Sequence, residues 1–148
     1  MKIALGSDHA GYGLKLTVKK YLIDNGYIVM DVGCDSIESC DYPVYGIRVG
    51  EAVANGDADR GIAICGSGIG ISIAANKVNG VRCALVHDQT IAKLSRQHND
   101  ANVLALPGRF ITPIKAQKIV GVWLNTPFDG GRHEKRVNII KDYEERRK

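Results

Sequence analysis

Short apolar runs alternate with segments of helical periodicity along nearly the whole chain. An apolar run of a few residues bounded by turn residues indicates a buried strand, and apolar residues at every third or fourth position indicate an amphipathic helix. The pattern predicts strands at residues 2–7, 27–32, 61–65, 81–86 and 102–106. It predicts helices at about residues 14–25, 43–55, 72–78, 89–97 and 113–123, and a last helix from about residue 132.

Strands that alternate with helices pair in parallel through crossover connections, which are right-handed. The predicted strands carry Val, Ile and Ala on both faces, as expected of a sheet that helices cover on both sides. No linker, repeat or low-complexity tract divides the chain. We therefore expect one domain over residues 1–148, with a Rossmann-like, three-layer α/β/α fold around a five-stranded parallel sheet.

Composition narrows the function classes. The 148 residues hold 20 Lys and Arg against 16 Asp and Glu, a net charge of +4, and residues 132–148 supply +3 of it. A solvated helix explains this excess of basic residues, although a small anionic ligand near the start of the segment is also compatible with it. Nucleic-acid binding would need a basic face with supporting aromatics, and aromatics are only 6%. The longest apolar runs fall well short of the ~18 residues of a membrane span, and we expect a cytoplasmic protein without a membrane partner.

The four cysteines form no CxxC pair and show no zinc spacing. Neither a structural metal site nor a disulfide scaffold is therefore expected. Cys83 lies in an apolar run and is expected to be a small core residue, whereas Cys65 ends the third predicted strand. Because ligands bind at the carboxyl ends of parallel strands, the residues that follow those strands are the candidates for chemistry. These are Ser7-Asp8-His9, Asp41-Tyr42, Cys65-Gly66-Ser67-Gly68, His87-Asp88 and Arg109.

The turn at residues 66–70, Gly-Ser-Gly-Ile-Gly, lies between a strand and a helix, where backbone amides can hold an anion. It is not the dinucleotide fingerprint, since residue 71 is Ile and the turn follows the third strand. That absence argues against a flavodoxin-like nucleotide-binding module. A thiolate is favoured at a helix N-terminus, so Cys65 is a candidate base or nucleophile, with Ser67 orienting it. Each of these interpretations has an alternative. Cys65 is then an inert cysteine at the end of a strand, the glycine-rich segment is a tight turn that needs positive φ, and the Ser67 hydroxyl bonds its own backbone.

Further candidates lie outside this turn. His98-Asn99 ends a predicted helix and offers an acid–base imidazole beside an amide donor, or else a simple partner of the helix dipole. Asp8-His9 is a second carboxylate–imidazole pair, or a turn device. Arg132 and Arg136 are four residues apart on one helix face, which suits a phosphate as well as a merely exposed basic face.

Taken together, the segments resemble the type B ribose-5-phosphate isomerase family, which includes galactose-6-phosphate isomerase subunits. The resemblance runs in order from residue 7 to residue 137. It rests on Ser7-Asp8-His9-Ala10-Gly11, Asp41-Tyr42-Pro43, Cys65-Gly66-Ser67-Gly68-Ile69-Gly70 with Ala74-Ala75-Asn76-Lys77, His98-Asn99-Asp100-Ala101-Asn102, Gly108-Arg109, and Gly130-Gly131-Arg132-His133 with Arg136-Val137.

The resemblance implies an aldose–ketose isomerase of ribose 5-phosphate that forms a cis-enediolate and uses neither a metal nor an organic cofactor. An isomerase of a 6-phosphohexose, such as allose or galactose 6-phosphate, is the alternative. The implied catalytic roles fall to Cys65 as base, Ser67 beside it, His98 as the acid that opens the sugar ring, and Asp8 as its counterpart in proton handling. The implied binding residues are Gly66, Ser67, Gly68, Ile69, Gly70 and Asn99 for the enediolate, His9, Arg109, Arg132 and Arg136 for the phosphate, and Tyr42 and Asp8 for the sugar.

The resemblance also implies a homodimer, or a tetramer built from such dimers, whose active site is shared between chains. Either Arg109 or the His98 segment would then come from the partner. Ser67 stands where the family often has threonine, which keeps the hydroxyl. Some members lack the cysteine and carry a carboxylate base slightly further along, but here Ile69, Ile71 and Ser72 offer no such group.

Overall fold

A parallel sheet of five strands forms the centre of the computed structural model, which describes residues 1–148. Its strands lie in the order β2-β1-β3-β5-β4. Their bounds are β1 Lys2–Ser7, β2 Ile28–Gly33, β3 Arg60–Cys65, β4 Cys83–Leu85 and β5 Val103–Pro107. The helices are α1 Tyr12–Asp24, α2 Tyr42–Ala54, α3 Ile69–Ala75, α4 Gln89–Asn99, α5 Pro113–Asn125 and α6 Arg132–Glu145.

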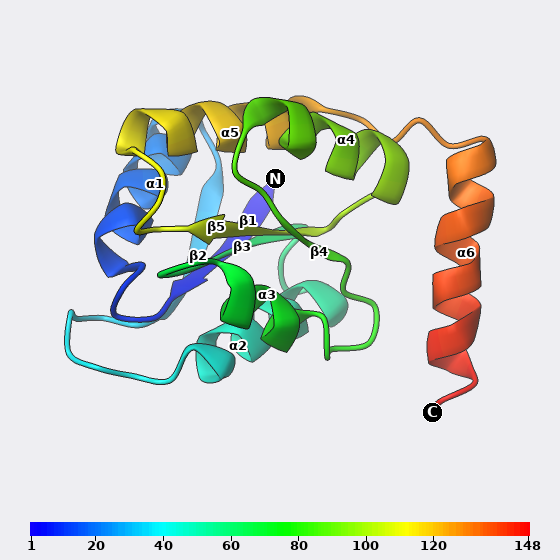
Figure 1. Ribbon diagram of the computed structural model, residues 1–148, viewed down its shortest axis with the longest axis horizontal. Helices are drawn as coiled ribbons and strands as arrows, with labels where there is room; N and C mark the ends of the chain where they lie inside the picture. Colours follow the sequence, from blue (N-terminus) through cyan, green and yellow to red (C-terminus); the bar gives the residue numbers. More distant parts are fainter.

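Helices cover both faces of the sheet, which confirms the three-layer α/β/α prediction (Figure 1). On one face, α1, α4 and α5 bury the larger apolar side chains of the molecule, among them the fully buried Trp123. On the other face, α2 and α3 pack smaller residues such as Ala52 and Ala75 against the sheet. The strands are apolar on both faces because each face has its own helical layer. No helix combines the length and the hydrophobicity that crossing a bilayer requires.

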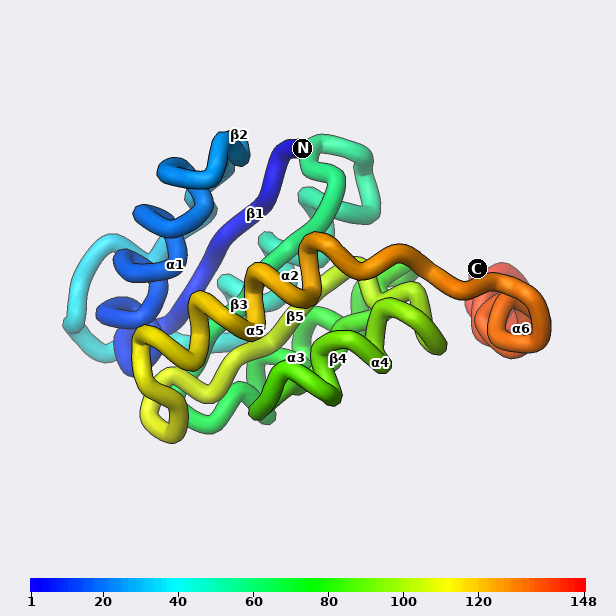
Figure 2. The backbone as a smooth tube through the Cα atoms, turned by 90° about the horizontal axis from the view of Figure 1, so that it is seen from above, coloured from blue at the N-terminus to red at the C-terminus, as the bar shows by residue number.

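Helix α6 stands apart from these layers. Figure 2 shows it almost end-on, beyond the end of α4 and outside the stack of helices over the sheet. It buries only His133 and Val137, although Ile139, Ile140 and Tyr143 are also apolar or aromatic and remain exposed. This helix begins at Arg132, the position from which the sequence pattern predicts it.

Most element boundaries shift by one or two residues from the prediction, and three differences are described here. Strand β4 spans only three residues rather than residues 81–86, because it lies at the edge of the sheet and pairs with β5 alone. Helix α3 begins at Ile69 instead of residue 72, directly after Gly68, whose φ of +76° ends the turn. Helix α4 continues to Asn99, and Asp100 then terminates it in a left-handed conformation with φ +47°.

Gly68 holds the turn after β3 tightly against the sheet. A Cβ at this position would lie 2.5 Å from Leu85 Cδ1. It would also lie 3.0 Å from the carbonyl carbon of Leu106 and 3.1 Å from the backbone nitrogen of Pro107. Its positive φ also disfavours any residue with a side chain. The path of the turn is therefore set by β4 and β5, the strands against which it packs.

One buried ion pair joins α1 to β2. Lys15 is 1% exposed, and its Nζ donates to Asp31 Oδ1 at 2.7 Å and to the carbonyl oxygen of Cys34. Burial alone would raise the pKa of Asp31, but hydrogen bonds from Lys15, the Gly33 N–H and Lys19 outweigh it and hold that pKa below its usual range. Asp31 therefore remains charged in the folded protein and balances the buried ammonium group.

We expect Asp31→Asn to lower the free energy of unfolding by about 2–3 kcal/mol, somewhat less than for a fully buried pair because the Asp31 side chain is 21% exposed. The depressed pKa of Asp31 means that its contribution is present above about pH 4 and is lost as the pH falls through the folded value. Urea denaturation of both proteins at neutral and acid pH measures this. The control is Asp24→Asn, whose partner Lys20 is exposed. Equal losses in the two variants would contradict the interpretation.

Candidate active site

A cleft of about 290 Å³ opens at the carboxyl ends of β1, β3 and β5, the edge where the sequence predicts a site. Loops after these three strands, the first residue of α2 and the second residue of α3 form its walls. The residues that line it are Asp8, His9, Ala10, Tyr42, Cys65, Gly66, Ser67, Gly70, Arg109 and Phe110. The structure thus brings together eight of the predicted site residues and adds Ala10, which lies in a segment of the family resemblance but had no predicted role, and Phe110, for which the sequence offered no signal.

Cys65 lies at the centre of this edge because β3 is flanked by β1 and β5. Its backbone carbonyl accepts a hydrogen bond from the Gly108 N–H at 2.8 Å, which ties the strand end to the loop after β5. The residue is only 4% exposed, yet it lines the cleft. A ligand in the cleft can therefore reach the thiol while bulk water is largely excluded from it.

Cys65 is also the thiol of the chain best placed for chemistry. All four cysteines are free. Burial raises the pKa of Cys83 to about 12, so this thiol stays protonated. Cys83 is half-buried and packs against the core, whereas the sequence predicts that it lies within the core. Burial and the neighbouring thiol of Cys34 raise the pKa of Cys40 as well. Neither Cys34, Cys40 nor Cys83 lines the cleft.

The turn after Cys65 presents unpaired amide donors. The backbone N–H groups of Gly66, Ser67 and Gly68 make no hydrogen bond within the chain, and those of Gly66 and Ser67 belong to residues that line the cleft. Such donors stabilise negative charge that develops on a ligand oxygen. The Ile69 N–H is occupied, because it donates to Ser67 Oγ at 3.2 Å. The Ser67 hydroxyl therefore has the local turn role that was the alternative to orienting the thiol.

Gly68 and Ile69, two predicted ligand residues of this turn, do not line the cleft. Gly68 is pressed against Leu85 and the end of β5, as described above. Ile69 is the first residue of α3, and the residue is 54% exposed. The turn predicted over residues 66–70 is thus shorter, and its cleft-lining part is Gly66, Ser67 and Gly70.

Tyr42 forms a wall of the cleft through its contact with Gly70. A Cβ at residue 70 would lie 2.6 Å from the Tyr42 ring, so the ring packs directly over this glycine. Tyr42 is the first residue of α2 and remains 42% exposed. The phenol ring can therefore contact a sugar in the cleft, as predicted for this residue.

Asp8 and His9 line the cleft from the loop after β1. Asp8 Oδ1 accepts the Gly11 N–H at 2.9 Å, which is the turn role weighed from the sequence, but its other carboxylate oxygen has no partner within the chain. His9 Nδ1 accepts the Cys40 N–H at 3.2 Å. A neutral imidazole that accepts at Nδ1 carries its proton on Nε2, which makes His9 a hydrogen-bond donor for an anionic ligand.

Arg109 supplies positive charge to the same cleft. Its backbone N–H donates to the Gly66 carbonyl at 3.0 Å, and its Nη1 lies 3.2 Å from the point where a Cβ of residue 66 would be. Its guanidinium makes no ion pair within the chain. Arg109 therefore lines the cleft of its own chain.

Besides Gly68 and Ile69, four predicted site residues do not line this cleft: His98, Asn99, Arg132 and Arg136. A helix after a parallel strand runs back across the sheet, so the end of α4 lies at the opposite edge (Figure 1). The Asn99 carbonyl accepts from Nε of Arg82, the residue directly before β4, at 3.0 Å. Arg132 and Arg136 are exposed on α6, next to this end of α4. One chain alone does not assemble the complete predicted site.

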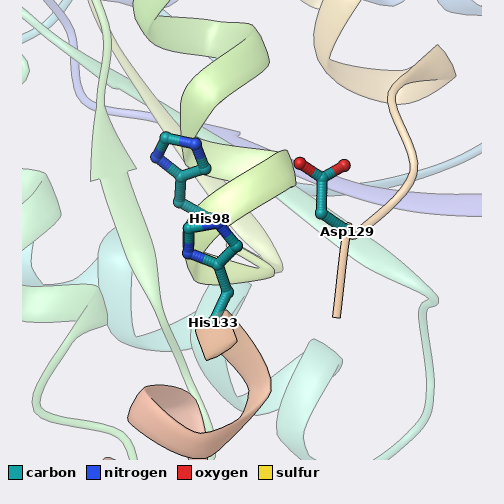
Figure 3. Close-up of side chains that lie close together, drawn as sticks. All are labelled: His98, Asp129 and His133. Carbon is teal, nitrogen blue, oxygen red and sulfur yellow. The ribbon is translucent and has the colours of Figure 1, made fainter. Parts of the chain in front are cut away.

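The structure instead joins His98 to two residues for which the sequence gave no role, Asp129 and His133 (Figure 3). The imidazole rings of His98 and His133 are stacked, with centroids 4.3 Å apart and planes 12° from parallel. Burial and the positive charge of His98, Arg132 and Arg136 lower the pKa of His133 below 6.5, against the opposing effect of Asp129. Spacing rules miss this cluster because its members lie on three separate segments.

Known proteins with similar sequences and structures identify the family to which this chain belongs. The model of the family described as Ribose/Galactose Isomerase matches residues 3–140. A curated relative, ribose-5-phosphate isomerase B of Escherichia coli, is 48% identical over 146 residues, which cover 99% of this chain and 98% of the relative. The solved structure of ribose-5-phosphate isomerase B from Clostridium thermocellum is 50% identical, superposes with a TM-score of 0.98 and covers 100% of both chains. The Mycoplasma genitalium enzyme with bound ribulose 5-phosphate is 43% identical, with a TM-score of 0.93 over 97% of this chain and 96% of its own.

Proposed function

Since the chain belongs to the ribose/galactose isomerase family, we propose that it interconverts D-ribose 5-phosphate and D-ribulose 5-phosphate through a cis-enediolate, with Cys65 as the base. The observation that carries this mechanism is the position of Cys65, which lines the cleft beside the unpaired amides of Gly66 and Ser67. A thiolate there can take the proton from C2 of the open-chain sugar and return it to C1, while the hydroxyl proton on O2 moves to O1, so that the carbonyl passes from C1 to C2. The enediolate oxygens carry the charge between the two transfers, and the amides stabilise it.

The phosphate is held at the Arg109 and His9 side of the cleft. The unpaired guanidinium of Arg109 can form two parallel hydrogen bonds to a phosphate, and His9 can donate from Nε2. Tyr42, whose ring packs over Gly70, bounds the sugar. When the phosphate is bound, the first carbons of the sugar lie near Cys65. Phosphate binding therefore orients the reacting carbon relative to the base.

His98, Asn99, Arg132 and Arg136 reach the cleft in our proposal from a second copy of the chain. Support comes from the exposed apolar side chains on the faces of α2, α3 and α6 that a partner would cover, namely Val44, Ile47, Ile69, Ile73, Ile139 and Ile140. In a symmetric dimer the same two surfaces meet twice, so each of the two clefts would receive one His98 segment. His98 would then open the sugar ring, with Asp8 as its counterpart and Asn99 as a further donor to the enediolate. A tetramer would pair two such dimers.

We also infer that the enzyme acts in the cytoplasm, which the four free cysteines support. The chemistry needs no organic cofactor, because the reaction only moves one proton from C2 to C1 and another from O2 to O1, with the amides stabilising the charge between these transfers.

The test of this function is the ratio of kcat/KM for ribose 5-phosphate to that for allose 6-phosphate and galactose 6-phosphate, measured with and without EDTA. We expect kcat/KM to be about 10–200-fold higher for ribose 5-phosphate, because one extra methylene group usually changes kcat/KM by this factor in a closely fitting pocket. Activity should be unchanged by the chelator. A preference for either hexose phosphate would transfer the function to the alternative substrate, and loss of turnover in EDTA would refute the metal-independent mechanism.

A further inference from the structure

We propose that His98, Asp129 and His133 form a binding site for a divalent transition-metal ion, with Zn²⁺ as the best match, and that its occupation inhibits the isomerase. The three side chains each offer one ligand atom, and these atoms lie within 4.8 Å of one another. Binding itself is independent of the function proposed above. The inhibitory consequence rests on it.

Three segments hold the cluster together. His98 lies in the last turn of α4, Asp129 in the connection between α5 and α6, and His133 in the first turn of α6. The Asp129 N–H donates to the Gln97 carbonyl at 3.1 Å, which fixes the connection beside the residue before His98. The His133 N–H donates to the Gly130 carbonyl, also at 3.1 Å. The backbone positions of all three ligands are thereby tied to one another.

The ligand set suits zinc. Two imidazoles and one carboxylate, with a fourth position left to water, form a known zinc arrangement with bonds of about 2.0–2.2 Å. Tetrahedral geometry at these bond lengths separates the ligand atoms by roughly 3.3 Å. The stacked rings and the exposed Asp129 carboxylate beside them (Figure 3) can approach this separation by rotation of the side chains.

Charge acts in both directions on this site. Each histidine binds a metal through the lone pair of a neutral imidazole, so metal binding competes with protonation. Asp129 adds a negative charge, while Arg132 and Arg136 repel a cation. We therefore expect micromolar rather than nanomolar affinity for Zn²⁺.

Inhibition follows because the metal would occupy a lone pair of His98. In the proposed reaction this imidazole moves a proton during ring opening, and a metal-bound nitrogen cannot do so. The metal would also hold the His98 ring in place through the ligand His133 that is stacked on it.

The experiment is calorimetric titration of the purified full chain with Zn²⁺ alone, followed by turnover assays over the same range of Zn²⁺. Asp129→Asn removes one ligand without touching the proposed catalytic groups, and Asp57→Asn, at an exposed position outside the cluster, is the matched control. We expect one Zn²⁺ per chain, binding weakened by at least about tenfold in Asp129→Asn only, and inhibition that shifts in parallel and is reversed by EDTA.

Titration with Co²⁺ separates this site from the thiols, because thiolate ligation gives a sulfur-to-cobalt charge-transfer band in the near ultraviolet. Weak visible bands without that band are expected. Equal Zn²⁺ affinity in the two variants, or a strong sulfur-to-cobalt band, would overturn the site. Zinc binding without inhibition would overturn the inhibitory role alone, and since calorimetry requires no turnover, a failed isomerase mechanism would leave the binding result intact.

Discussion

Cys65→Ala is expected to reduce kcat for ribose 5-phosphate by about 10²–10⁴-fold, the range that a positioned acid–base group contributes. The apolar residues Ile69 and Ile71 and the hydroxyl of Ser72 follow it, so no carboxylate in this segment can replace the lost thiolate. Binding of a phosphorylated inhibitor should change little, because Arg109 and His9 are untouched. Steady-state kinetics and inhibitor titration measure the two quantities separately.

The matched control for this variant is Cys83→Ala, which removes a thiol that does not line the cleft and whose pKa is about 12. It should keep wild-type turnover, with at most a small loss of thermal stability from the buried edge of the sheet. Near-wild-type turnover by Cys65→Ala would sink the assignment of the base. A large loss of inhibitor binding would instead show that the variant has disturbed the cleft.

The second large effect concerns two inactive variants mixed together. Cys65→Ala and His98→Asn should each be strongly impaired, yet an equal mixture that has exchanged subunits should regain about one quarter of wild-type activity. In a random mixture half of the dimers are hybrids, and one of their two sites combines intact Cys65 from one chain with intact His98 from the other. Recovery on this scale cannot occur if both residues serve the site of a single chain.

Mixing Cys65→Ala with Asp8→Asn supplies the control for this experiment. Both residues line the same cleft of the same chain, so every site of the hybrid keeps one defect and no activity should return. The asparagine can still accept the Gly11 N–H that Asp8 Oδ1 accepts, which preserves the turn. Native mass spectrometry must show hybrids in both mixtures. Hybrids of the first pair without recovered turnover would refute the shared site.

The arrangement of the sheet and the cleft was predictable because both depend on periodic signals. Apolar runs and helical spacing predict the β/α alternation, and parallel connections place Asp8, Cys65 and Arg109 at one edge. Prediction was weaker where one residue's conformation decides the outcome. Because Gly68 is left-handed, α3 begins three residues earlier in the chain than predicted. Ile69 then belongs to the helix and does not line the cleft.

The position of His98 shows a different limit. The same rule that gathers Cys65 and Arg109 places the far end of α4 at the other edge of the sheet, so a single-chain interpretation of the motif cannot be complete. The approach of Asp129 and His133 to His98 depends on the path of the connection between α5 and α6. No periodicity or local spacing encodes that path, and the cluster was visible only in three dimensions.

The tight packing of Gly68 against Leu85 and the end of β5 has a consequence for how the pocket can diversify. The amide donors of Gly66 and Ser67 form the floor of the pocket. The turn that carries them packs against β4 and β5, so these donors cannot shift to suit a longer sugar without deforming the two strands. The rim is different, because Tyr42 and Phe110 are 42% and 73% exposed. Efforts to redirect the enzyme toward other phosphorylated sugars should therefore reshape the rim and keep the floor unchanged.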